Sequence, residues 1–242
     1  MLMNKVRLDV ACVALGKTRT KAQDLIKEGK VKVNGKVISK PSTLVLESDA
    51  VEIDDADSYV SRGAYKLKGC LDSLAIDLID QICLDIGAST GGFTQVCLDK
   101  GAKKVYALDV GHLQLDPLLD RDARVIKMEG HNARYIETSW FEDSIDFLCM
   151  DVSFISCKTI LEPVFSKLKP EHCAILIKPQ FECGPQYLNT KGVLKSEKIR
   201  NKIVEDIKHF VLQTYQDVVV EKSQIQGRHG NQEYMLYAKE RR

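Results

Sequence analysis

The sequence lacks several features that would assign it at once to a class of protein. Its 242 residues carry 35 Lys and Arg against 34 Asp and Glu, so a net charge of +1 gives no overall basic or acidic character. No apolar run reaches the roughly 18 residues that a membrane helix needs, and there is no signal peptide. We therefore expect a cytoplasmic protein that does not enter a membrane.

Metal and disulfide patterns are also missing. The eight cysteines include no C-x-x-C pair, and several, such as Cys83, Cys149 and Cys173, lie within apolar runs. The histidines show no spacing typical of metal ligands. We expect buried, reduced thiols and no metal site.

The small net charge hides an uneven distribution. Residues 1–40 hold ten Lys and Arg but only three acids, a net +7, and the remaining 202 residues carry −6. Such asymmetry indicates a polyanionic partner for the first segment, although lysines that merely solvate a surface remain the alternative.

Local patterns predict a small α+β domain in this basic segment. Leu8, Cys12 and Leu15 recur at helical spacing, and a second short helix ends at Gly29. The Asn34-Gly35 pair between two β-type runs predicts a hairpin. We predict a nucleic-acid-binding domain over residues 1–57 and a polar linker over 58–63.

From residue 64 to 242 apolar strands alternate with helices, which predicts a Rossmann-like α/β domain. The last two strands leave no room for a helix between them, so the seven-stranded, mostly parallel sheet should include one antiparallel strand. The predicted strands are 82–87, 104–110, 124–129, 145–151, 173–179, 217–223 and 233–238, and the clearest helices are 91–100, 155–168 and 195–214.

The stretch LDIGASTGGFTQ, residues 84–95, forms the first turn between strand and helix, where doubly wound sheets bind their ligands. It matches neither the dinucleotide fingerprint G-x-G-x-x-G nor the phosphate loop that ends in Gly-Lys-Ser/Thr. The next strand ends in Asp109, placed to bind two ribose hydroxyls. The pattern favours S-adenosylmethionine over NAD.

Four charged residues fall where the predicted topology brings chain segments together. Lys66 begins the helix before the first strand, Asp151 and Lys178 close the fourth and fifth strands, and Glu233 opens the last one. Taken singly, each is an ordinary surface lysine, helix cap or strand-edge charge. Together they collect two amines and two carboxylates beside the cofactor turn.

Five motifs in this order, SRGAYKL, LDIGASTGGFTQ, CMDVSF, LIKPQFE and GNQEYM, resemble the TlyA (hemolysin A) family. Its larger domain is similar to FtsJ-type ribose 2′-O-methyltransferases. The segment RLDVACVALGKTRTKAQDLIKEGKVKVNG resembles the S4 RNA-binding domain. The resemblance implies methylation of cytidine ribose in ribosomal RNA, free or in a subunit, with Lys66, Asp151, Lys178 and Glu233 as catalytic tetrad.

The resemblance also suggests residues for cofactor and RNA. FtsJ-type enzymes have an acid near the adenine after the third strand, whereas EGHNAR stands here, so Asn132 is our candidate. The predicted cofactor residues are Asp85, Gly87, Ala88, Ser89, Gly91, Gly92, Phe93, Asp109, Asn132 and Asp151. The predicted RNA contacts are Arg7, Lys17, Arg19, Lys21, Lys30, Lys32 and Lys36.

A ribose hydroxyl is a poor nucleophile, so its proton must leave as the methyl group arrives. We hypothesise that Lys178 accepts that proton, while Lys66 lowers the pKa of Lys178 and orients the hydroxyl. Two rival functions stay open: a hemolysin-like membrane-active protein, and a non-catalytic RNA-binding assembly factor. The short N-terminus resembles family forms that modify the large subunit only.

Overall fold

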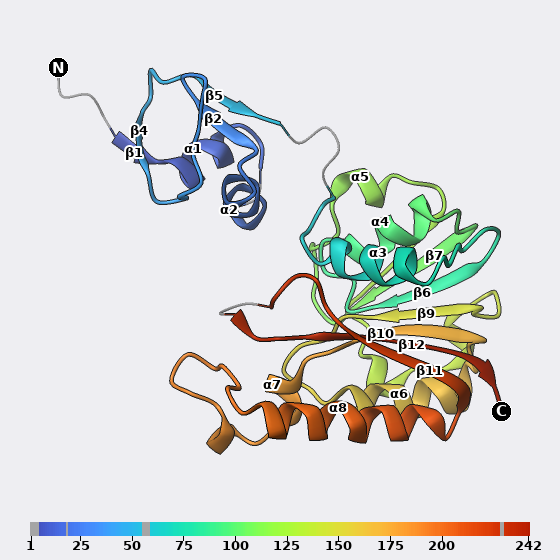
Figure 1. Cartoon of the computed structure of the whole chain (residues 1–242). Helices are drawn as coiled ribbons and strands as arrows, with labels where there is room; N and C mark the ends of the chain where they lie inside the picture. Colours follow the sequence, from blue (N-terminus) through green and yellow to red (C-terminus); the bar gives the residue numbers. More distant parts are fainter. Residues whose placement is uncertain (1–4, 18, 55–58, 228–229) are drawn as a thin grey trace. The chain divides into compact units, whose positions relative to one another are not determined.

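The computed structural model describes residues 5–17, 19–54, 59–227 and 230–242, and the chain divides between Arg62 and Gly63 into two compact units (Figure 1). Each unit has its own hydrophobic core. Residue 58 of the predicted linker lies outside the described residues, so the linker boundaries stay a prediction.

The first unit is a small α+β domain, as the sequence predicted. Two helices pack on two short antiparallel sheets, β1 with β4 and β3-β2-β5. Its elements are β1 (Lys5–Arg7), α1 (Leu8–Ala14), α2 (Arg19–Lys27), β2 (Val31–Val33), β3 (Lys36–Val37), β4 (Leu44–Leu46) and β5 (Val51–Ile53).

Side-chain pattern and turn chemistry explain this local structure. Leu8 and Cys12 are buried on α1, but Leu15 lies just beyond its last residue and is 53% exposed. Asn34 and Gly35 both have positive φ (50° and 77°), the geometry that a two-residue hairpin turn needs. The predicted hairpin is thereby confirmed as β2–β3.

The second unit is built on a seven-stranded sheet of order β11-β12-β10-β9-β6-β7-β8. Only β12 runs antiparallel to its neighbours, β10 and β11, so the predicted fold class is confirmed. The strands are β6 (Ile82–Ile86), β7 (Lys104–Asp109), β8 (Val125–Glu129), β9 (Phe147–Met150), β10 (His172–Ile177), β11 (Tyr215–Lys222) and β12 (Tyr234–Arg241).

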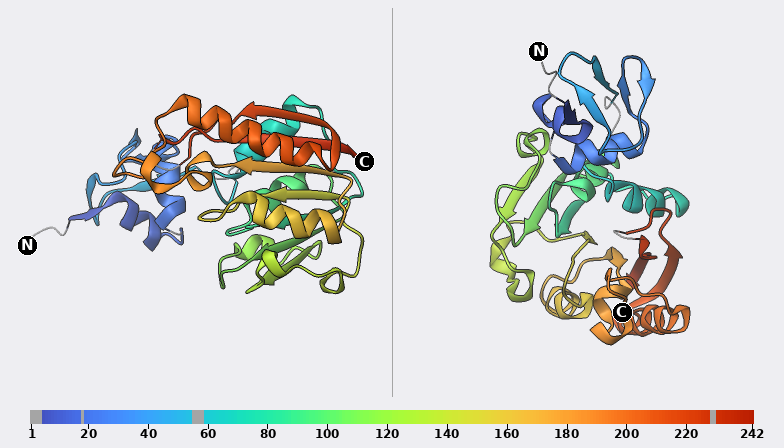
Figure 2. Two further views of the ribbon diagram at one scale, coloured as in Figure 1. Left: turned by 90° about the horizontal axis from the view of Figure 1, so that it is seen from below. Right: turned by 90° about the vertical axis from the view of Figure 1, so that its left-hand side faces the viewer.

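Helices cover both faces of this sheet (Figures 1 and 2), which is why β6, β9 and β10 are buried along their whole length. α3 and α4 lie on one face, and α6 and α8 on the other. The helices are α3 (Ala64–Ser73), α4 (Gly92–Asp99), α5 (Pro117–Asp120), α6 (Cys157–Lys167), α7 (Pro179–Glu182) and α8 (Glu197–Leu212), with single 3-10 turns at Ala133–Tyr135, Thr138–Trp140 and Pro185–Tyr187.

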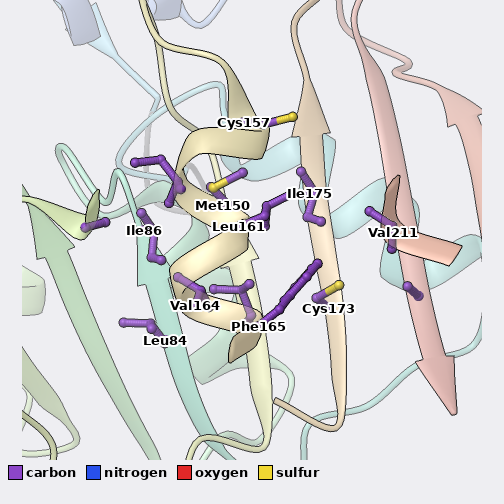
Figure 3. Packing of buried hydrophobic residues seen from close by; sticks show 14 of the residues in the cluster. Leu84, Ile86, Met150, Cys157, Leu161, Val164, Phe165, Cys173, Ile175 and Val211 are labelled. Carbon is purple, nitrogen blue, oxygen red and sulfur yellow. The ribbon is translucent and has the colours of Figure 1, made fainter. Parts of the chain in front are cut away.

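The core between the sheet and α6 fixes the central strands in place. Leu161, Val164 and Phe165 of α6 pack with Ile86 of β6 and Ile175 of β10 in one buried cluster (Figure 3). Close packing of this kind fixes the positions of the ends of β6, β9 and β10 relative to one another. The residues that follow these strand ends therefore share one preformed edge.

Candidate active site

The Gly-rich turn after β6 has the backbone shape of a ligand cradle. Gly87 and Gly91 have φ of 83° and 94°, and Ser89 between them also has a positive φ of 49°. A side chain at Gly87 would overlap the carbonyl oxygen of Asp151, and one at Gly91 would overlap Leu119. Conformation therefore favours glycine at both positions, and at Gly87 contact with backbone also leaves no space for a side chain.

Asp109, at the end of β7, ties this turn to the loop that follows. Its Oδ2 accepts a hydrogen bond from the backbone N–H of Ser89 at 2.8 Å, and its Oδ1 accepts one from Gly111 at 2.7 Å. Each carboxylate oxygen keeps a further lone pair. Asp109 therefore still has acceptors for two ribose hydroxyls, and its predicted role in cofactor binding stays a prediction.

Asp85 lies beneath the turn and is fully buried. The Thr94 hydroxyl donates to its Oδ2 at 2.7 Å, while its Oδ1 has no hydrogen-bond partner among the described residues. Burial raises the pKa of Asp85 to about 7, and the nearby Asp151 and Asp109 carboxylates add to the effect. A cation bound near Asp85 would stabilise its ionised form and so lower this pKa.

In the loop after β8, Asn132 caps a short turn, and its contact with the cofactor stays a prediction. Asn132 Oδ1 accepts the backbone N–H of Arg134 at 3.1 Å and so caps a short 3-10 turn. The carboxylate nearby is Glu129, which sequence reasoning missed although it closes β8. It accepts the backbone N–H groups of Leu113, Gln114 and Leu115, and these bonds lower its pKa. Glu129 thereby fixes the loop that follows Asp109.

Two lysine–carboxylate pairs gather the four predicted catalytic residues. Lys66 Nζ lies 2.6 Å from Glu233 Oε2, and their side chains are 11% and 3% exposed. Lys178 forms an ion pair with Asp151 and donates a hydrogen bond to Ser153 Oγ at 2.8 Å. The four charges are thus joined as two matched pairs, both largely withdrawn from solvent.

Strand register brings the two pairs to the same edge of the sheet. Ile177 of β10 pairs with Tyr234 of β12, so the next positions, Lys178 and Glu233, face each other across these strands. Met150 of β9 pairs with Ile86 of β6 and with Ile175 of β10, which puts Asp151 beside the Gly-rich turn. The cofactor turn and both pairs therefore share one edge.

The one-turn helix α7 connects this edge to its surroundings, and sequence reasoning missed its role. Gln180 Nε2 donates to Glu233 Oε1 at 3.0 Å. Glu182 accepts the Ser156 hydroxyl at 2.6 Å and the Cys157 N–H at 2.7 Å, which caps α6. A glutamine two residues beyond a strand-end lysine was the available signal.

An exposed aromatic residue also marks this edge. Phe154 lies three residues after Asp151, is 89% exposed and has a φ of 63°, unusual for a bulky side chain. Its ring centroid lies 4.7 Å from that of Phe181 on α7. The loop thus presents a hydrophobic ring to solvent beside the lysine–carboxylate pairs.

The basic residues of the first unit include an ordered cluster around Asp9. This carboxylate is fully buried and accepts two bonds from Arg7, at 2.9 and 2.8 Å, and one from Gln23 at 2.8 Å. Arg19 lies 3.6 Å from it. The Arg7 guanidinium holds the pKa of Asp9 well below its usual range.

The other predicted RNA contacts lie in two places. Lys21 donates to the carbonyl oxygen of Tyr59, and Lys17 precedes α2. Lys32 and Lys36, on the β2–β3 hairpin, are exposed, and Lys30 precedes the hairpin. Over the part of the chain that the structure describes, no helix is long and apolar enough to cross a membrane, and no cluster of His, Cys, Asp or Glu is arranged to hold a metal ion.

Comparison with known proteins identifies both units. The FtsJ-like methyltransferase family matches residues 59–240, and the S4 domain matches residues 6–51. Hemolysin A of Brachyspira hyodysenteriae is 40% identical over 237 residues, which cover 96% of this chain and 99% of that protein. This chain belongs to the TlyA (hemolysin A) family.

Two further relatives extend the comparison. The protein named 16S/23S rRNA (cytidine-2′-O)-methyltransferase TlyA of Mycobacterium tuberculosis is 36% identical, over 98% of this chain and 90% of its own length. A solved structure of a hemolysin candidate from Streptococcus thermophilus superposes with a TM-score of 0.74 at 37% identity, over 98% of this chain and 90% of that one. As a TlyA-family protein with an FtsJ-like domain, the chain is a methyltransferase.

Proposed function

We propose that this enzyme transfers the methyl group of S-adenosylmethionine to the 2′-hydroxyl of a cytidine in ribosomal RNA. The observation that carries the proposal is the pair of lysine–carboxylate contacts, Lys66–Glu233 and the more exposed Lys178–Asp151, at the edge that bears the Gly-rich turn. The TlyA relative named as an rRNA (cytidine-2′-O)-methyltransferase supports the choice of RNA and nucleotide.

The residues around the turn fit a cationic nucleoside cofactor. Three carboxylates, Asp85, Asp109 and Asp151, stand at the ends of neighbouring strands, and the orphaned Asp85 Oδ1 adds buried negative potential. When bound, S-adenosylmethionine supplies a methyl group on a positively charged sulfur. The backbone from Gly87 to Phe93 would hold its amino-acid tail, and Asp109 its ribose. We assign Asn132 to the adenine: its Oδ1 accepts the Arg134 N–H, and its amide nitrogen would be the donor to the cofactor.

The chemical step requires one proton to leave the ribose hydroxyl as its oxygen gains the methyl carbon and the carbon–sulfur bond breaks. We assign Lys178 Nζ, in its neutral form, as the acceptor of this proton, with Asp151 and Ser153 fixing its position. Lys66 orients the hydroxyl, and Glu233 holds Lys66 in place. Bringing hydroxyl and methyl donor together supplies much of the remaining acceleration.

Binding of the RNA is the proposed task of the first unit. We assign residues 1–57 as the RNA-binding domain, 58–63 as the linker and 64–242 as the methyltransferase domain. The S4 match at residues 6–51 and the Arg7–Asp9–Arg19 cluster support this assignment. These cations would position RNA through its phosphates rather than read its sequence. Action on ribosomal RNA would place the enzyme in the cytoplasm.

The test is methyl incorporation into ribosomal RNA and into each ribosomal subunit from a strain that lacks the enzyme, followed by mapping of the modified ribose. Lys178→Ala should bind cofactor and RNA normally but transfer no methyl group. Lys198→Ala, an exposed lysine of α8, is the matched control and should be fully active. Near-normal turnover by Lys178→Ala would remove Lys178 as the proton acceptor.

The same experiment separates the two rival functions. A non-catalytic assembly factor would bind RNA without methylating any subunit. A membrane-active protein would lyse erythrocytes equally well as the wild type and as Asp109→Ala or Lys178→Ala. Methylation that depends on both residues, without lysis, supports the enzyme.

A further inference from the structure

Glu233 is the least exposed of the four predicted catalytic residues, and its two oxygens have different partners. Its side chain is 3% exposed, with Oε2 bound to Lys66 at 2.6 Å. Oε1 accepts a hydrogen bond from Gln180 Nε2 at 3.0 Å, and Gln180 itself is only 7% exposed. One cation and one neutral amide thus share this carboxylate.

The surroundings leave little freedom to this arrangement. A side chain at Gly227 would overlap Glu233 Oε1, so the carboxylate lies directly against that glycine backbone. On the other side, α7 is held by Glu182, which caps α6, and by Phe181, which packs on Phe154. The backbone that carries Gln180 is therefore held in place, and burial encloses its side chain.

Packing alone does not account for a glutamine at this position. Its Oε1 is buried and has no hydrogen-bond partner among the described residues. An unsatisfied buried polar atom costs about 1–3 kcal/mol. A methionine would fill the same volume without that cost. What glutamine adds is the N–H that it donates to Glu233.

We propose that Gln180 is a positioning residue, whose neutral amide holds the Glu233 carboxylate so that its charge is directed to Lys66. A cation in its place would compete with Lys66 for the carboxylate, and an apolar group would leave Oε1 buried without a donor. The proposal rests on the proposed function, in which Glu233 fixes Lys66 beside the ribose hydroxyl.

The decisive variant is Gln180→Glu, which replaces the amide by a carboxyl of the same shape. Two carboxyls in contact share one proton, and one of their two pKa values is strongly raised. While the new carboxyl is protonated, it donates an O–H to Glu233 as the amide does. Once it ionises, it repels Glu233 and releases Lys66 from its position.

The charged groups on the elements around α7 have to be included in this expectation. Lys66 comes from α3, Lys178 and Asp151 from the ends of β10 and β9, Glu182 from α7 itself, and Arg200 from α8. Both Glu182 oxygens are occupied at the start of α6, and Arg200 donates to the carbonyl oxygen of Leu194. Among the residues that the structure describes, Lys66 is the cation in contact with the Glu233 carboxylate.

The experiment measures methyl transfer by the full-length chain between about pH 6 and about pH 8.5, with each variant expressed as a ratio to wild type at the same pH. For Gln180→Glu the ratio should be near one at the acidic end and fall about tenfold or more toward the alkaline end. A residue with only a packing role would lower the rate by the same factor at every pH.

Two further variants complete the test. Gln180→Met has no donor and should lose about tenfold or more in kcat at every pH, with normal cofactor binding and a normal melting temperature. Gln186→Glu adds the same charge at an exposed position nearby and should follow wild type throughout.

The outcomes separate this inference from the function on which it rests. If wild type transfers no methyl group, or Lys178→Ala remains active, the proposed function fails. If wild type is active and Lys178→Ala is not, but Gln180→Glu follows the wild-type pH profile or Gln180→Met keeps the wild-type kcat, the positioning role of Gln180 is wrong. If Gln180→Glu does not fold, the kcat of Gln180→Met decides.

Discussion

The Thr94 hydroxyl donates to Asp85 Oδ2 over 2.7 Å, inside the protein and directly beneath the cofactor turn. Burial raises the pKa of Asp85 to about 7, although this hydrogen bond acts in the opposite direction. In the unfolded chain the same group titrates near about 4. The difference predicts both a pH dependence of stability and a proton linked to cofactor binding.

Between about pH 4 and pH 7 the folded protein holds a proton on Asp85 that the unfolded chain has lost. Stability from this group is therefore full below that window and falls as pH rises through it. Asp85→Asn should remove this loss of stability. The difference in melting temperature between Asp85→Asn and wild type should therefore shift in favour of the variant from about pH 5 to about pH 8. Comparison with wild type at each pH cancels other groups, such as His172, whose pKa burial lowers to about 4.

Cofactor binding should expel the Asp85 proton. A cation above the turn favours the ionised carboxyl, so at about pH 6.5 binding of S-adenosylmethionine should release a fraction of a proton at this site. Calorimetry in buffers of different ionisation enthalpy measures that number. Asp85→Asn should lack this contribution, and an unchanged proton count would contradict the linkage.

The Gly-rich turn allows a matched pair of glycine substitutions. Gly87 and Gly192 have positive φ, 83° and 72°, so alanine is strained by about 1–2 kcal/mol at either. At Gly192 a new side chain meets open space, whereas at Gly87 it overlaps Asp151 O. Gly87→Ala should lose methyl transfer and cofactor binding, while Gly192→Ala should lose only stability. Equal activity in the two variants would show that the turn tolerates displacement.

Phe154 should act on the RNA and not on the cofactor. An exposed ring at this edge offers a stacking surface for a base, a contact that contributes about 1–3 kcal/mol. Phe154→Ala should therefore lower kcat/KM for RNA about tenfold or more, with unchanged cofactor affinity and melting temperature. Leu113→Ala, 96% exposed and outside the α7 contact, serves as control. A loss confined to cofactor affinity would refute the assignment.

Asp9 should affect RNA binding through its two arginines. Asp9→Asn removes the charge that orders Arg7 and Arg19, so affinity for ribosomal RNA should fall and its salt dependence should become shallower. Asp49→Asn is the control, because Asp49 bonds Asn34 and the Leu46 N–H in the same unit. If both variants lose RNA affinity equally, the effect comes from folding of the unit.

The sequence was sufficient for the fold because its signals were local and strong. Continuous apolar runs predicted β6, β9 and β10, and Asn34-Gly35 predicted the β2–β3 hairpin. Short elements such as α7 escaped prediction, since four residues give no periodicity. The order of the strands, and hence the meeting of Lys178 with Glu233, followed from the resemblance and from topology rules.

Site residues were predictable to the extent that they carry charge at strand ends. Lys66, Asp151, Lys178 and Glu233 lie together, although their catalytic roles stay predictions. Gln180 and Glu129 were not predicted, because their importance lies in which atoms they contact. The sequence marks the amide donor only by a glutamine close to the strand-end lysine, and an acid that binds three N–H groups has no sequence signature.

The position of β12 between β10 and β11 has a consequence for the order in which the protein is made. A ribosome adds residues 1–232 before it adds Glu233 and the strand Tyr234–Arg241 that follows. Since domains fold as units during synthesis, the basic first unit can fold early, while Lys66 has no carboxylate partner until Glu233 has been added. The growing chain thus has its proposed RNA-binding domain well before its proposed catalytic site is complete.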